Sequence, residues 1–423
     1  MIQRFANGLF LLAIFLLPLQ TQAILGQGNV SGEPSAYAVL GVYVVEVMIL
    51  FVFLLRMLRS NDKEVRVVGK ELYLVLAAAF FSLTVSRFTS IGWFHMIHVV
   101  SAAMLFFLLT DERTKLKPVL VAFLFGLIVP ITIGWFQGLT GVSPESTLLG
   151  VSAKDAQTLG VAVVETVSGR TLRAYGTLPH PNIFGGYLAI GVLALAWLTR
   201  FVKNKREFIG MLIGSAILGS TLVITFSRSA WLGLLIGLMV LVGLMLKYKK
   251  MPPKHAIPVM SLGLVCAVVT LGIFYSEVFA RFNPTLRLEA ISIEERASQY
   301  QTFGSVFFSS PFLGVGPSAY TFTLAKQDPG QPVWSYQPIH NAFLLILAEL
   351  GIIGFALFIL WIGRIGRMSH KAVSTPNGMF AVALSVSLTV IALFDHYLWS
   401  LWPGLALGAF TLALIVRWSK VGS

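Results

Sequence analysis

The chain has 423 residues, of which 56% are hydrophobic and 12% are charged, and its mean hydropathy is +0.82. Soluble domains carry about 25% charged residues, so this composition excludes a soluble protein and indicates one that crosses a membrane several times. The net charge of +13 lies in short clusters between apolar runs, so we expect a lipid bilayer and no nucleic acid as its partner.

Twelve apolar runs are each long enough, or nearly so, to cross a hydrocarbon core of about 30 Å. They predict an all-α polytopic membrane protein with about 12 transmembrane helices, near 5–20, 37–57, 70–86, 91–110, 117–138, 182–201, 208–226, 229–247, 256–276, 341–363, 377–395 and 400–417. The first run also resembles a secretory signal, in which case residues 1–23 would be removed and eleven spans would remain.

The loops between these runs predict the orientation of the chain. With a cytoplasmic N-terminus, 22 of the 31 Lys and Arg residues fall on the cytoplasmic side, including the basic stretch 56–70. Since cytoplasmic loops are enriched in these residues, we place both termini in the cytoplasm.

Two connections stand out by their length, 139–181 and 277–340, and both are predicted to be external. The chain then divides into helices 1–9 over residues 1–276, a large external loop over 277–340, and helices 10–12 over 341–423. Within the large loop, Ser292 and Glu295 match a capping box, which predicts a helix over 293–308.

Basic and imidazole side chains occur at the external ends of spans that run inward. Arg173 and His180 precede the sixth span, Arg228 lies in the tight turn that opens the eighth, and His340 precedes the tenth. The free N–H groups and positive dipole ends of these helices face the same side. The sequence therefore predicts an anion site at the outer membrane boundary.

Other polar residues join this candidate site. Asn182 and Asn341 are predicted to cap the sixth and tenth helices. The large loop adds three arginines that could bind the anion, and two aromatic rings that could stack on a sugar: Arg281, Arg287, Arg296, Trp334 and Tyr336.

The residue types suggest a division of labour. Arginine suits a pyrophosphate because its planar fork donates paired hydrogen bonds and keeps its charge. An imidazole near a positive dipole end is held neutral, as a general base requires. We therefore predict that His340 takes a proton from a hydroxyl while Arg228 and Arg173 hold a leaving phosphate. Asp328 and Asp395 look isolated, so we expect no metal and no cofactor.

Structural alternatives exist for several of these residues. His340 would also suit anchoring at the membrane boundary, and Arg296 a salt bridge with Glu295. Glu46 and Glu349 lie within predicted spans, where each needs a partner or a polar cavity.

Four stretches of the chain carry a family resemblance. They are Arg173–Tyr187 (RAYGTLPHPNIFGGY), Phe226–Trp231 (FSRSAW), Arg296 with Pro311–Gly316 (PFLGVG), and Ile339–Gly354 (IHNAFLLILAELGIIG). In this order and spacing, over about 170–363, they resemble the O-antigen ligase and O-antigen polymerase superfamily of membrane enzymes.

The resemblance implies a GT-C-like helical glycosyltransferase whose donor is a glycan on undecaprenyl pyrophosphate. It implies that Arg173 and Arg228 contact the pyrophosphate, that Arg296 or another loop arginine assists, and that His340 activates the acceptor hydroxyl with inversion at the sugar. The acceptor would be a lipid A core sugar for a ligase, or another lipid-linked repeat for a polymerase, and the plan of spans slightly favours a ligase.

Two other classes of function stay open from the sequence. One is a secondary transporter for an anion such as bicarbonate, which would need a site reachable from both faces. The other is a non-catalytic partner in envelope polysaccharide export, which would tolerate loss of His340.

Overall fold

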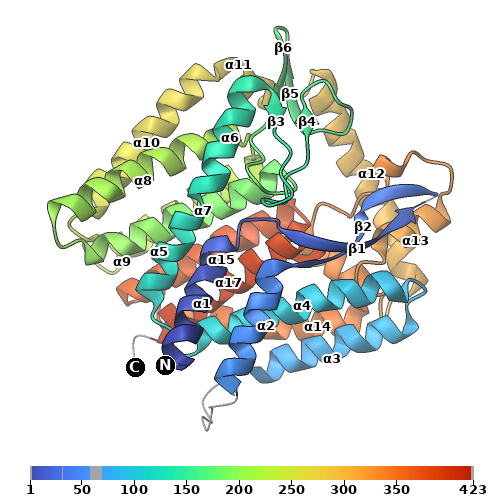
Figure 1. Cartoon of the computed structure of the whole chain (residues 1–423), viewed down its shortest axis with the longest axis horizontal. Helices are drawn as coiled ribbons and strands as arrows, with labels where there is room; N and C mark the ends of the chain where they lie inside the picture. The colour runs from blue at the N-terminus through green and yellow to red at the C-terminus, as the bar shows by residue number, and fades with distance from the viewer. Residues whose placement is uncertain (1, 31, 58–68, 421–423) are drawn as a thin grey trace.

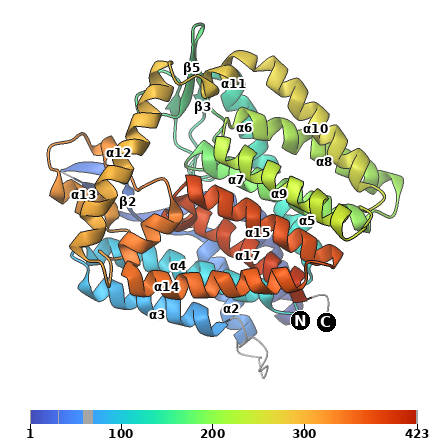
Figure 2. The same cartoon turned by 180° about the vertical axis from the view of Figure 1, so that it is seen from behind.

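The computed structural model describes residues 2–30, 32–57 and 69–420, and the basic stretch 56–70 lies partly outside them. Nine helical stretches in these ranges are long and apolar enough to cross a membrane, in agreement with a polytopic membrane protein. They are α4 (Thr89–Thr110), α5 with α6 (Leu116–Gly126 and Ile128–Thr140), α7 with η2 (Pro181–Leu198 and Thr199–Phe201), α8 (Lys205–Ile224), α9 (Arg228–Lys247), α10 (Ala256–Ile273), α14 (Ala342–Lys371), α15 (Pro376–Phe394) and α17 (Trp402–Lys420). Figure 2 shows α14, α15 and α17 side by side.

The first three predicted spans are shorter helices, α1 (Ile2–Leu16), α2 (Val44–Met57) and α3 (Gly69–Val85). The prediction of a helix over 37–57 is wrong in its first part, because residues up to Tyr43 form strand β2 (Glu33–Tyr43), which pairs antiparallel with β1 (Gln22–Val30). An apolar run does not by itself distinguish a strand from a helix, and here a partner strand decides the outcome.

Helix α7 lies at the centre of the bundle and is buried along its whole length. Two glycines let other elements approach it closely. A Cβ at Gly185 would crowd Ser227 at the start of α9, and a Cβ at Gly186 would overlap the hydroxyl of Tyr397 in α16 (Tyr397–Ser400). The two glycines of the RAYGTLPHPNIFGGY stretch thus bring the start of α9 and helix α16 against the start of α7.

The two long connections form a layer along one side of the bundle, at the top and right of Figure 1, whereas both termini lie at its lower edge. The first holds short strands, and the second holds the long helix α12 with three shorter helices: β3 (Val142–Ser143), β4 (Lys154–Asp155), β5 (Val163–Thr166), β6 (Gly169–Leu172), α11 (Tyr275–Phe282), α12 (Arg287–Ser309), α13 (Tyr320–Gln327) and η3 (Val333–Ser335). Thr171 donates a hydrogen bond to Glu277 at 3.1 Å, so the two connections pack on each other.

Helix α12 corrects the predicted capping box. It begins at Arg287, so Ser292 lies inside the helix and caps nothing. The residue that precedes the helix is Leu286, whose side chain makes no capping hydrogen bond. Contacts with α11 and β5 accompany this earlier start, which the local motif did not indicate.

Two of the family-like stretches interlock through their backbones. Helix α14 is broken at Gly351, which has φ +65°, and the Pro311–Gly316 segment enters the break. Ile352 N–H donates to the Pro311 carbonyl at 2.9 Å, and Gly316 N–H donates to the Glu349 carbonyl at 3.0 Å. A Cβ at Gly314 or at Gly351 would overlap the opposite backbone, so both positions require glycine.

The two buried glutamates predicted to need partners have them. Glu349 accepts from Trp399 Nε1 at 2.7 Å and from the N–H of Ser318 at 2.8 Å. Glu46 lies 2.7 Å from His98 Nδ1. Both carboxylates therefore join helices or loops within the bundle.

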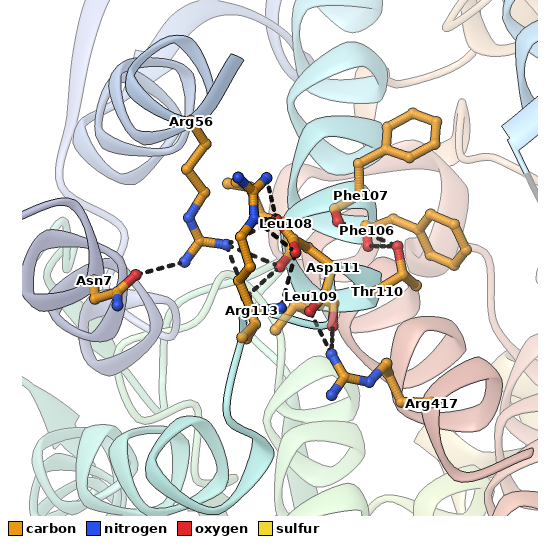
Figure 3. A network of polar contacts seen from close by, with 11 residues as sticks. Asn7, Arg56, Phe106, Phe107, Leu108, Leu109, Thr110, Asp111, Arg113 and Arg417 are labelled. Carbon is orange, nitrogen blue, oxygen red and sulfur yellow. Dashed lines mark hydrogen bonds and ion pairs between the residues drawn. The ribbon is translucent and has the colours of Figure 1, made fainter. Parts of the chain in front are cut away.

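At the end of the bundle away from the two long connections, arginines cap the last turn of α4 (Figure 3). Arg56 from α2 donates to the Leu108 carbonyl at 3.3 Å and to Asn7 of α1 at 3.1 Å. Arg417 from α17 donates to the Leu109 carbonyl at 3.3 Å. Guanidinium groups suit a helix C-terminus, whose carbonyls lack helical partners, and this network ties four helices together.

Candidate functional site

Polar side chains from several elements meet beneath the layer formed by the two long connections, where α7, α9 and α14 begin and α15 ends. We name this group the arginine-histidine cluster, and it consists of Arg173, His180, Asn182, Arg228, Arg281, Glu289, Arg296, Gln299, His340, Asp395 and His396. It contains seven of the eleven site residues predicted from the sequence.

Arg173 is held at the base of the cluster and is only 5% exposed. Its Nε donates to the Thr225 carbonyl at 2.9 Å and its Nη2 donates to Asn182 Oδ1 at 2.6 Å. The same amide also bonds Asp395, because Asn182 Nδ2 donates to Asp395 Oδ2 at 2.6 Å. Arg173, Asn182 and Asp395 thus form one buried chain of hydrogen bonds across α7 and α15.

His180, and not Asn182, caps α7. The Nδ1 of His180 accepts from the N–H of Asn182 at 3.1 Å, so its Nε2 carries the proton of the neutral ring. Burial, followed by the charge of Arg173, holds the pKa of His180 well below 6.5. Asn182 lies one residue inside the helix, which leaves its amide for Arg173 and Asp395 instead of the cap.

Arg228 and Arg281 share the carboxylate of Glu289. Arg228 Nη1 lies 3.0 Å from Glu289 Oε2 and donates to the Arg281 carbonyl at 2.7 Å, and Arg281 makes an ion pair with the other oxygen of Glu289. The backbone at Phe226 has φ +48°, and Arg281 Nε donates to its carbonyl at 3.4 Å. One carboxylate therefore faces two guanidinium groups, so Arg228, Arg281 and Glu289 together carry a net charge of one positive unit.

Arg296 lies near both the Arg228–Glu289 ion pair and His340. Its half-buried guanidinium lies within electrostatic range of Asp395, Arg228 and Glu289, and its charge also acts on His340. Within the part of the chain that the structure describes, no hydrogen bond satisfies its side-chain donors. An anionic ligand at this position would meet a guanidinium with free donors.

His340 is oriented by Gln299 of α12. Gln299 Oε1 lies 3.1 Å from the backbone N–H of His340 and 2.8 Å from its Nδ1. A backbone N–H only donates, so Oε1 is the acceptor in both contacts and Nδ1 carries the ring proton. The lone pair is therefore on Nε2, the nitrogen available to take a proton.

The surroundings of His340 keep it neutral. Burial, with a smaller contribution from the charge of Arg296, lowers the pKa of His340 from 6.5 to about 4. The ring of His396 packs edge-on against it with centroids 5.0 Å apart, and His396 has its own pKa lowered by burial. A neutral imidazole with a free Nε2 is the form required for a general base at neutral pH.

Four predicted site residues lie outside the cluster or have another role. Arg287 is exposed and pairs with Glu165 at 2.8 Å, and Trp334 is exposed on the surface of the loop. Tyr336 is 2% exposed, so its ring is buried in the loop and cannot stack on a sugar. Asn341 caps α14 as predicted, accepting from the N–H of Phe343 at 3.0 Å.

The sequence prediction that Asp395 is isolated is wrong. Its carboxyl is 3% exposed and bonded to Asn182, and burial raises the pKa of Asp395 from 3.8 to about 6. Glu289 and Gln299 were also missed, and no local pattern singles them out, because they matter only through contacts with distant residues. A usable signal existed for Asp395 and His396, which form a polar pair between two apolar runs.

The chemistry of this arrangement is that of an anion site beside a base. Arginine donors line one part of the cluster and are only partly satisfied by Glu289, while the free nitrogen of a neutral imidazole lies in another part. Such a site can hold a phosphate-bearing group and deprotonate a hydroxyl next to it.

Comparison with known protein families agrees with this chemistry. Residues 213–359 match the family described as O-antigen ligase, and the matched region includes Arg228, Arg281, Arg296 and His340, whereas Arg173 precedes it. A search of curated proteins finds no match for the chain. The family match confirms the predicted resemblance to the O-antigen ligase and polymerase superfamily over residues 213–359.

Proposed function

We propose that this protein is a membrane glycosyltransferase of the O-antigen ligase type. It transfers a glycan from undecaprenyl pyrophosphate to a sugar hydroxyl of the lipid A core, at the periplasmic face of the bacterial inner membrane. The observation that carries this proposal is the juxtaposition of partly unsatisfied arginines with a neutral His340 whose Nδ1 is bonded to Gln299, which leaves the lone pair on Nε2.

The proposed reaction follows from these positions. Arg228, Arg281 and Arg296 hold the pyrophosphate, and Arg173 supports it from beneath through its charge. His340 Nε2 takes the proton of the acceptor hydroxyl as the oxygen attacks the anomeric carbon from the side opposite the pyrophosphate. The bond from that carbon to the pyrophosphate oxygen breaks, and the electron pair leaves with undecaprenyl pyrophosphate. The sugar linkage is therefore inverted, and no metal is required in this scheme.

The same site would serve a polymerase, whose acceptor is a second lipid-linked repeat. A secondary transporter fits less well, because the cluster lies at the ends of α7, α9 and α14 and not at their middle, where such transporters bind their substrates.

The test is transfer in vitro with the purified full chain and a lipid-linked glycan. Lipid A core and a second lipid-linked repeat are supplied in separate reactions, each with and without EDTA. We expect extended lipid A core product in both conditions. Product only with the repeat would identify a polymerase, loss with EDTA would contradict the metal-free scheme, and no product with either acceptor would overturn the proposal.

A further inference from the structure

A second polar site lies at the opposite ends of the helices that form the arginine-histidine cluster. Helices α7 and α9 begin at the cluster and end beside this site, whereas α15 begins beside it. Helices of 18 to 20 residues rise about 30 Å, at roughly 1.5 Å per residue, so the two sites are separated by the thickness of a bilayer core.

This site is a cavity of about 440 Å³, which we name the basic pocket. Four of its lining residues are basic or imidazole side chains, Arg200, Lys250, Lys254 and His255, and none of the described lining residues is a carboxylate. One water needs roughly 10–15 Å³ of such space, so a group as large as a phosphodiester fits.

Arg200 is the fixed element of the basic pocket. Its guanidinium lies over the rings of Trp197 and Phe380, at 4.8 and 5.3 Å from their centroids, and its Nη1 donates to Asn377 Oδ1. Its Nε is buried and has no hydrogen-bond partner among the described residues. Ring faces attract a cation but do not neutralise it, so a half-buried guanidinium without a carboxylate favours an anionic ligand.

The other residues that line the basic pocket indicate which kind of molecule bears the anionic group. Met245, Met379 and Phe380 give the basic pocket an apolar side, and Lys250 and Lys254 are exposed at its edge. Basic side chains at the ends of transmembrane helices, next to apolar surface, are the features that bind phospholipid head groups. A soluble phosphate would use the basic side chains but not the apolar wall.

We propose that the basic pocket binds the phosphate of an anionic phospholipid, in the membrane leaflet opposite the arginine-histidine cluster. Arg200 contacts the phosphate, Lys250 and Lys254 add mobile charges, and the acyl chains follow the apolar side. This site is independent of glycan transfer, and it stabilises the ends of α7, α9, α10 and α15 against one another.

The test compares two double variants of the full chain that lose the same charge. Lys250→Gln with Lys254→Gln removes the edge of the basic pocket, and Lys203→Gln with Lys205→Gln removes two exposed lysines that do not line it. Thermal unfolding is measured in phosphatidylcholine nanodiscs with and without phosphatidylglycerol. Wild type and the Lys203/Lys205 control should gain about 3–6 °C from phosphatidylglycerol, and the pocket variant less than half of that.

A second arm distinguishes the source of the phosphate. Inorganic phosphate is added to wild type in phosphatidylcholine nanodiscs, with sodium chloride at equal ionic strength as the control. No stabilisation by inorganic phosphate supports a lipid ligand, whereas stabilisation equal to that by phosphatidylglycerol would overturn the lipid assignment. The whole proposal is overturned if the pocket variant and the Lys203/Lys205 control respond equally to phosphatidylglycerol.

Discussion

Arg228 combines charge with geometry in a way that lysine cannot reproduce. Its guanidinium bonds the Arg281 carbonyl and Glu289 through one nitrogen and leaves other donors for a ligand. A lysine ammonium is a point charge that cannot span these partners and a phosphate together. Arg228→Lys should therefore lower kcat/KM for the donor by about tenfold or more, as expected from losing a charged hydrogen bond of roughly 1.5–3 kcal/mol.

The matched control for this variant is Arg287→Lys, a loop arginine that is exposed and lies outside the cluster. Its kcat/KM should stay within about twofold of wild type, because exposed ion pairs contribute only about 0–1 kcal/mol. Full activity in Arg228→Lys would mean that Arg228 acts only through its positive charge, and equal losses in the two variants would mean that the effect is not specific to the cluster.

Gln299 is a positioning residue whose effect passes through His340. Gln299→Leu removes the acceptor that keeps the proton on Nδ1, so the productive tautomer is no longer enforced. We expect kcat to fall by about tenfold, for a loss of roughly 1–1.5 kcal/mol, with little change in donor KM. Gln299→Glu retains the acceptor and should raise the pKa of His340, which would move the acid limb of the pH profile upward. Wild-type kcat in Gln299→Leu would remove Gln299 from the mechanism.

The pH dependence of transfer reports on two groups with opposite shifts. Because the pKa of His340 is lowered to about 4, the imidazole stays neutral and kcat should remain flat from pH 7 to about pH 5. Because the pKa of Asp395 is raised to about 6, this carboxyl takes up a proton over the same range and the cluster becomes more positive. Donor KM should thus fall as pH decreases through 6, and Asp395→Asn should abolish that fall. A kcat that halves near pH 6.5 would indicate an ordinary histidine.

The sequence analysis located the four arginines of the cluster and missed Glu289, Gln299, Asp395 and His396, which join it through contacts with distant residues. Arg173, Arg228 and His340 stand next to predicted spans, where dipole and charge arguments apply. Gln299 lies within a surface helix, and its role depends on the contact of α12 with the start of α14. That contact follows from tertiary packing, which periodicity does not encode.

The break in helix α14 requires a glycine at position 351. Gly351 has φ +65°, so any side chain there is strained. A Cβ at this position would also overlap the carbonyl of Phe312. Gly351→Ala should destabilise the protein by at least roughly 1–3 kcal/mol. Thermal unfolding in detergent measures this effect, and transfer activity should fall with it because His340 begins the same helix.

Gly366 of the same helix provides the control for that substitution. A Cβ there meets no atom within 4 Å, so Gly366→Ala should be neutral or stabilise by up to about 1 kcal/mol. If the two variants unfold at the same temperature, the interlock between Pro311–Gly316 and α14 does not contribute to stability.

The helices were largely predicted from apolar runs, and the strands were not. The predicted span 117–138 is helical but divided into α5 and α6 near Pro130, which has no N–H to continue the ladder. Strand β2 escaped prediction because its second half merges with the apolar run that continues into α2, and β1 escaped it because its Gln, Gly and Asn residues break the apolar pattern. The two strands pair with each other, and Tyr37 of β2 packs on His396 with ring centroids 5.8 Å apart.

In the whole molecule, groups of basic side chains lie at the two opposite ends of the helices. The arginine-histidine cluster lies under the layer formed by the two long connections, and the basic pocket and the α4 network (Figure 3) lie at the other end of the helices. The family-like stretches supply residues to the arginine-histidine cluster, which also places a base next to arginines. We therefore assign chemistry to the cluster, and anchoring and lipid contact to the opposite end.

The central claim is that His340 activates the acceptor while the arginines hold the donor. It is tested most directly by single-turnover transfer from a lipid-linked glycan, comparing His340→Ala with wild type at pH 7. The account predicts a loss of about 10²–10⁴-fold in transfer rate, the usual contribution of a general base, with donor binding retained. Transfer by His340→Ala at the wild-type rate would contradict it.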